Sequence, residues 1–159
     1  MQSLLSVRID KYLSVNLHNE SYVCFWNFVI LWNLFESRLF GNKYSPKALD
    51  GKSLLIPCVE VVQDTLSYLK TRYVTNSTLN SVFQRLHLRG DTDKESLVKS
   101  VLLGNNQEQN AQIEAIIIII GRYRNNLFHG IKEIASIDLQ KDTFEIANNF
   151  LMTILENNR

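Results

Sequence analysis

Arg124 and His129 lie near the C-terminal end of the chain, in the segment "GRYRNNLFHG". Arginine presents a planar fork that matches phosphate oxygens, and it stays charged at any ordinary pH. Histidine titrates near neutrality and can take or give a proton. Together these groups suit metal-free cleavage of RNA. The imidazole would deprotonate a ribose 2′-hydroxyl or protonate the leaving oxygen, while the guanidinium stabilises charge on the phosphorus.

The residues around this pair indicate how the two groups meet. On an unbroken helix, Arg124 and His129 would lie about 140° apart. His129 is followed by Gly130, however, and glycine is favoured where a helix ends in the left-handed conformation. We therefore expect the helix to end near His129, so that the guanidinium and the imidazole both border the mouth of one cleft. Asn125 and Asn126 supply neutral donors and acceptors beside them.

One histidine cannot easily supply both proton transfers of the reaction. We therefore expect a homodimer whose two-fold axis lies at this helix end, because such an axis brings two copies of the segment together. The predicted site is a composite cleft between two subunits.

Five isoleucines, Ile116 to Ile120, directly precede this segment. A run of β-branched residues favours a strand, but no other part of the chain offers an obvious strand to pair with it. The apolar positions also follow helical spacing. We therefore predict a central, mostly buried helix over Gln107–Phe128. Arg124 lies on its buried stripe, so it must point into a protected cleft or across an interface, since an unpaired buried cation is costly.

The rest of the chain is also predicted to be helical. Its two prolines and six glycines fall between apolar-periodic segments, which is typical of helical bundles. There is no internal repeat or linker, so we expect one all-α domain over residues 1–159. The other predicted helices are Leu4–Leu17, Ser21–Gly41, Lys52–Tyr73 with an interruption at Pro57, Thr78–Leu88 after a capping Ser77, Lys94–Leu103 and Ile137–Glu156.

Composition narrows the class of protein. Hydrophobic residues make up 45% of the chain and charged residues 21%, which is ordinary for a globular protein. A net charge of +1 gives no global field that would attract nucleic acid or a membrane, so a site for a polyanion must be local. Two cysteines in apolar segments form no disulfide framework. We expect a cytoplasmic protein with no membrane contact, no metal and no cofactor.

The segment "RNNLFHG" resembles the signature of the HEPN superfamily, whose members are all-helical ribonuclease domains of toxin–antitoxin modules, phage-defence systems and RNA-guided effectors. Such domains are typically up-and-down helical bundles that dimerise across a shared cleft. The resemblance implies that Arg124 and His129 are the catalytic pair of an antiviral or toxin endonuclease, with Asn125 as the polar residue that follows the arginine. It also implies a regulatory or antitoxin protein partner. Ile131 stands where many members have a second glycine.

A weaker resemblance concerns "LWNLFES", which precedes the motif helix as in many HEPN proteins. It implies that Glu36 approaches the motif and orients Arg124 or His129. The alternative is structural: Glu36 or Glu114 could pair with Arg124 in an ordinary ion pair, and His129 could be only a helix cap, favourable at the negative end of the helix dipole.

Four further alternatives stay open. Asn125 and Asn126 could simply help to end the helix. The aromatic residues of Ser21–Gly41 suit a core or dimer surface better than a platform for stacked bases. Four cations on the predicted short helices could line an RNA path or be merely solvated: Arg85, Arg89, Lys94 and Lys99. The whole chain could also be a non-catalytic HEPN-like module that binds RNA, a nucleotide or a protein. The intact pair of Arg124 and His129 favours the nuclease.

Overall fold

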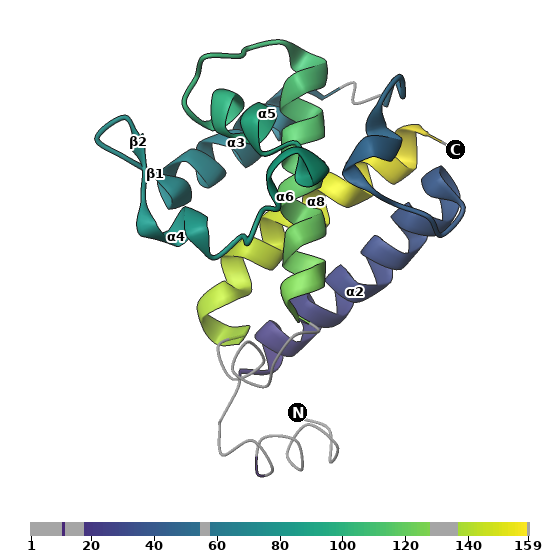
Figure 1. Ribbon diagram of the computed structural model, residues 1–159. Coiled ribbons are helices and arrows are strands. Elements are labelled where there is room, and N and C mark those ends of the chain that lie inside the picture. Colours follow the sequence, from purple (N-terminus) through teal and green to yellow (C-terminus); the bar gives the residue numbers. More distant parts are fainter. Residues whose placement is uncertain (1–10, 12–17, 55–57, 128–136, 159) are drawn as a thin grey trace.

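The computed structural model describes residues 11, 18–54, 58–127 and 137–158 (Figure 1). This part of the chain is mostly helical, so the predicted all-α class is confirmed. The predicted helix Leu4–Leu17 lies outside the described residues, apart from Lys11. The α-helices are α2 (Asn19–Phe40), α3 (Val59–Tyr73), α4 (Ser81–Gln84), α5 (Glu95–Leu102), α6 (Gln109–Leu127) and α8 (Lys141–Asn157). The 3₁₀ turns are η1 (Pro46–Leu49), η2 (Gly90–Asp93) and η3 (Ile137–Gln140).

Helix α6 runs through the middle of the molecule. In Figure 1, α8 crosses behind its middle and α2 passes near its lower end, and α3 and α5 lie beside it. Its isoleucines Ile116 to Ile120 are each at most 1% exposed. Helices therefore surround the run closely, and the prediction of a central helix is confirmed. The strand preference of β-branched residues is overridden here, because burial stabilises the helix more than intrinsic preference opposes it.

Helices α2 and α8 pack along each other, and aromatic rings fill their contact. The ring centroids of Phe28 and Phe144 are 5.2 Å apart, and both side chains are fully buried. α2 ends at Gly41, which has a φ of 56° and donates its N–H to the Glu36 carbonyl. This left-handed cap suits glycine, and it turns the chain back so that the residues after it lie beside the last turns of α2.

Two sequence predictions are wrong in detail. The segment Thr78–Leu88 is not one helix: β1 (Val74–Thr75) and β2 (Thr78–Leu79) form a small antiparallel hairpin, followed only by the short α4. The turn residues Asn76 and Ser77 both have positive φ, 51° and 61°, which is the geometry of a two-residue hairpin turn. α4 is capped by Asn80, whose side chain accepts from two backbone N–H groups, and not by Ser77.

The predicted helix Lys52–Tyr73 begins only at Val59, because residues 52–54 are not helical. The predicted interruption at Pro57 lies outside the described residues. The remaining predicted helices agree with α2, α5, α6 and α8 to within a few residues, except that α8 is preceded by η3. None of the helices among the described residues combines the length and the apolar character that crossing a bilayer requires.

Candidate functional site

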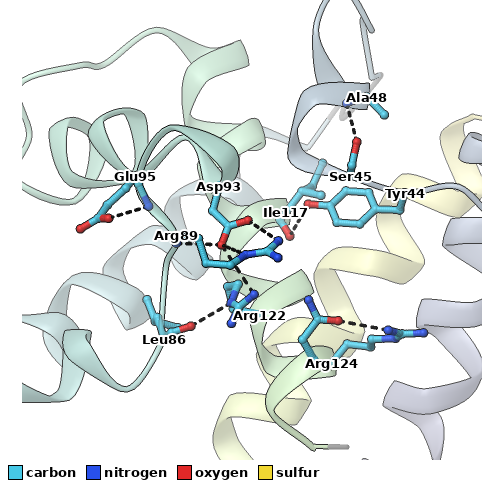
Figure 2. A network of polar contacts seen from close by, with 12 residues as sticks. Tyr44, Ser45, Ala48, Leu86, Arg89, Asp93, Glu95, Ile117, Arg122 and Arg124 are labelled. Atoms are coloured by element: carbon cyan, nitrogen blue, oxygen red, sulfur yellow. Dashed lines mark hydrogen bonds and ion pairs between the residues drawn. The ribbon is translucent and has the colours of Figure 1, made fainter. Parts of the chain in front are cut away.

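Arg124 lies in the last turn of α6 and is partly buried. Its Nη1 donates a hydrogen bond of 3.1 Å to Oδ1 of the neighbouring Asn125. In Figure 2 the side chain extends away from α6 toward α2. It lines a small cavity there with Val29 and Asn33, which lie near the middle of α2. We predicted from the sequence that Arg124 points into a protected cleft or across an interface, and in the structure its side chain borders this cavity.

A second hollow beside Arg124, of about 110 Å³, also holds Glu36 and Asn125. We call it the α2–α6 pocket. Three of the five predicted site residues therefore share one pocket, although they come from two helices far apart in the sequence. Its remaining walls come from Trp32, Tyr44, Ser45, Pro46, Arg89, Asp93, Ile118, Gly121 and Arg122.

Glu36 is held in place by two donors. Its carboxylate accepts a hydrogen bond of 3.2 Å from Nε1 of Trp32 and one of 3.3 Å from the backbone N–H of Tyr44. Within the described chain, no ion pair joins Glu36 to Arg124. Glu114, the other structural partner considered for Arg124, pairs with Lys94 at 2.9 Å. Glu36 thus contributes a fixed negative charge to the pocket that Arg124 borders.

The two other predicted site residues are not part of this pocket. Asn126 donates from Nδ2 to the carbonyl oxygen of Arg85 at 3.0 Å and lines a separate cavity. Its contact ties the end of α6 to the end of α4. His129, the second predicted catalytic residue, lies outside the described residues, as does Gly130.

A buried acid beside the pocket was not singled out from the sequence. Asp93 is 1% exposed and accepts two side-chain hydrogen bonds from Arg89, at 3.1 Å and 3.0 Å. Nη1 of Arg122 lies 3.6 Å from the same carboxylate, and Nε of Arg122 donates to the Leu86 carbonyl (Figure 2). The available signal was the i, i+4 spacing of Arg89 and Asp93.

The two arginines decide the protonation of Asp93. Burial by itself would raise the pKa of this carboxyl, but the hydrogen bonds from Arg89 and the positive charges of Arg89 and Arg122 outweigh burial and lower it. Asp93 is therefore a carboxylate at neutral pH. It joins the loop before α5 to α6 and gives the pocket a second fixed negative charge.

Gly121 forms part of the pocket wall where α6 comes closest to an aromatic cluster. A Cβ at this position would lie 3.0 Å from Cε1 of Tyr44 and 3.2 Å from the Trp32 ring. The rings of Trp32 and Tyr44 are themselves packed edge to face, with centroids 5.0 Å apart. The absence of a side chain at Gly121 therefore lets α6 approach these rings.

Comparison of the chain with known protein families, with curated proteins and with solved structures finds no match. Among the described residues, no group of three or more His, Cys, Asp and Glu side chains is arranged to hold a metal ion.

Proposed function

We propose that this protein is a metal-independent endoribonuclease of HEPN type that cleaves RNA through Arg124 and His129 in a composite site of a homodimer. It would act as a toxin or phage-defence effector under the control of a protein partner. One observation carries the proposal. Arg124 stands at the end of a buried helix and borders a pocket with Asn125 and Glu36, in a mostly helical chain whose sequence contains "RNNLFHG".

The role of Arg124 follows from its surroundings. Asn125 accepts a hydrogen bond of 3.1 Å from Nη1 of its guanidinium, and the guanidinium fork is the side-chain group that best matches phosphate oxygens. Glu36 is already bonded to Trp32 and Tyr44, so its charge can orient Arg124 from a fixed position. A guanidinium oriented in this way would stabilise the negative charge that develops on a phosphate during cleavage.

A stripe of exposed apolar side chains on α2 supports the homodimer. Val23, Trp26, Ile30 and Leu34 are 43–56% exposed, and their spacing of three or four residues places them on one face of the helix. Met152 of α8 continues the patch at 42% exposure. We call these five residues the α2 stripe. A contiguous exposed apolar surface of this kind is typical of an interaction site.

A second copy of the chain fits the α2 stripe well. If two α2 helices packed antiparallel about a two-fold axis, the acidic first turn with Glu20 would lie near the basic last turn with Arg38 of the other copy. The helix dipoles would oppose each other favourably. The two-fold axis would also place corresponding lateral edges of the two α2 helices on the same side of the dimer.

This dimer arrangement affects the candidate site, because Arg124 borders one lateral edge of α2. It lines a cavity with Val29 and Asn33, close to the middle of Asn19–Phe40. Antiparallel packing about the middle of α2 would therefore bring the two copies of Arg124 toward each other on one side of the dimer. The α2 stripe thus supports a composite cleft with two arginines.

The test is cleavage of single-stranded RNA by purified full-length protein in EDTA. We expect products with 2′,3′-cyclic phosphate ends. Arg124→Ala and His129→Ala should each abolish cleavage, while circular dichroism shows an unchanged fold. Lys70→Ala, which removes a half-buried cation from the last turn of α3, is the control and should cleave normally. A strict requirement for a divalent metal would overturn the mechanism.

The same samples distinguish a ribonuclease from the alternative, a non-catalytic HEPN-like module. Such a module would bind RNA without cutting it, and Arg124→Ala would change only the affinity. Cleavage that survives in both Arg124→Ala and His129→Ala would exclude these residues as the catalytic pair.

A further inference from the structure

A second, larger cavity of about 340 Å³ lies where the ends of α3, α4 and α6 meet. This volume is at the lower end of the range for small-molecule sites. We call it the tyrosine pocket, and we define it by its polar members Arg72, Tyr73, Arg85, Tyr123, Asn126 and Gln140. Neither Arg124 nor Glu36 lines it, so it is distinct from the α2–α6 pocket.

The hydroxyl groups of Tyr73 and Tyr123 in the tyrosine pocket cannot use both of their protons in the hydrogen bond that joins them. The hydroxyl oxygens of Tyr73 and Tyr123 are 2.8 Å apart, and the two residues are only 2% and 9% exposed. Each hydroxyl carries one proton, and only one of the two protons can lie in their mutual hydrogen bond. The other proton points elsewhere and needs an acceptor.

The arginines add donors and positive charge but no acceptor. Nε of Arg72 is buried without a hydrogen-bond acceptor in the described part of the chain, and its guanidinium lies 5.8 Å from the centre of the Tyr73 ring. Over the same ranges, no carboxylate forms an ion pair with Arg72 or with Arg85. A partly buried guanidinium without a counter-charge is unfavourable, so an anion in this cavity would stabilise the site.

The protonation of the tyrosines keeps them donors. Burial raises the pKa of Tyr123 well above its ordinary value, and burial likewise raises the pKa of Tyr73 although Tyr123 and Arg72 oppose that change. Both hydroxyls are therefore protonated at neutral pH. The pocket presents hydroxyl and guanidinium donors together, which is the pattern that binds phosphate oxygens.

We propose that the tyrosine pocket binds the phosphate group of a small ligand of mononucleotide size. The terminal nitrogens of Arg72 and the spare tyrosine proton would bind phosphate oxygens. Arg85, which is exposed, would add its charge at the rim. The apolar side chains of Val82 and Leu127 line the same cavity and would face the organic part of the ligand. This proposal is independent of the ribonuclease reaction.

The test is calorimetric titration of the full-length protein with three probes: inorganic phosphate, adenosine monophosphate, and a short 2′-O-methyl RNA that cannot be cleaved through its 2′-hydroxyl. We expect adenosine monophosphate to bind and inorganic phosphate to compete with it. If only the RNA binds, and binding depends on the same residues, the phosphate comes from an RNA backbone. The phosphate chemistry is then still supported.

Substitutions tie the binding to this pocket. Arg72→Gln and Tyr123→Phe should each weaken binding about tenfold, because each removes a hydrogen bond or charge to the phosphate. Arg85→Gln changes an exposed side chain and should weaken it severalfold, so a test remains if Arg72→Gln fails to fold. Arg124→Ala should bind normally, which separates this site from the proposed catalytic one.

Two results would overturn the proposal. The first is no binding of any of the three probes at millimolar concentration. The second is binding that is unchanged in both Arg85→Gln and Tyr123→Phe while thermal unfolding shows that both variants are folded.

Discussion

Arg122 and Arg124 are two positions apart on α6, but their side chains leave the helix in different directions and meet different partners. Arg122 bonds to the Leu86 carbonyl and lies 3.6 Å from the carboxylate of Asp93. Arg124 extends toward α2 and bonds to Asn125 (Figure 2). Both arginines line the α2–α6 pocket, but Arg122 ties α6 to Leu86 and Asp93, whereas Arg124 reaches toward α2.

This difference predicts opposite outcomes for two matched substitutions. Arg124→Ala should reduce RNA cleavage at least about a hundredfold, as expected for loss of a group that stabilises transition-state charge, with little change in urea denaturation. Arg122→Ala should lower the free energy of unfolding by about 2 kcal/mol, because it leaves the Leu86 carbonyl without its donor and Asp93 with one arginine fewer. If Arg124→Ala is the more destabilising of the two, Arg124 is structural.

The lowered pKa of Asp93 predicts a pH dependence of stability. An unfolded aspartate has a pKa of about 3.9, and in the folded protein Asp93 titrates lower, because the hydrogen bonds and charges of Arg89 and Arg122 outweigh the effect of burial. Its contribution to stability is therefore complete above the unfolded pKa and is lost as the pH falls through the folded pKa.

The measurement is urea denaturation of the wild type and of Asp93→Asn between pH 7 and pH 3. The wild type should be more stable at pH 7, and its advantage should begin to shrink as the pH falls to about 4. An advantage that stays constant down to pH 3 would show that Asp93 does not titrate in this way.

Gly121→Ala tests the close approach of α6 to the aromatic cluster. Alanine would favour the helix by about 1 kcal/mol, but its Cβ would lie 3.0 Å from Cε1 of Tyr44. The Tyr44 ring packs against the rings of Trp32 and Phe40, so it cannot easily move, and overpacking costs about 1–3 kcal/mol. We expect a net destabilisation of about 1 kcal/mol.

A double-mutant cycle identifies the cause. In a Tyr44→Leu background the smaller side chain leaves room, so Gly121→Ala should be neutral or stabilising there. An equal cost in both backgrounds would place the clash elsewhere.

The α2 stripe predicts the effect of a charge on self-association. Ile30→Asp should raise the dissociation constant of the dimer at least about tenfold, since each dimer would carry the change twice and would lose burial of both isoleucines. Val59→Asp is a matched control, because Val59 is 53% exposed and Ile30 is 56% exposed, but Val59 lies on α3. Sedimentation velocity across a range of concentrations measures both variants. A wild-type protein that stays monomeric at high micromolar concentration would rule out this interface.

Local sequence signals located the helices well where they agreed with one another. The apolar spacing of Ser21–Gly41 and the glycine at its end identified α2 and its cap. The prediction of one helix over Thr78–Leu88 is wrong, because the positive φ of Asn76 and Ser77 produces a hairpin that the apolar pattern does not reveal. Asn80, which caps α4, is equally ordinary as a loop residue in the sequence.

The sequence by itself determined that the chain is helical, that Ile116–Ile120 is its buried centre, and that Arg124 stands at the polar end of that helix. These features depend on residue type and on spacing along one segment. Only the tertiary structure showed that Glu36, which the sequence linked to Arg124 through a resemblance alone, lines one pocket with it. The tertiary structure also buried Asp93 between two arginines and left Tyr73 and Tyr123 sharing a hydrogen bond in a cavity that no carboxylate of the described residues lines. Such relationships join residues from different elements, and they depend on how the helices pack against one another, which spacing along a single segment does not specify.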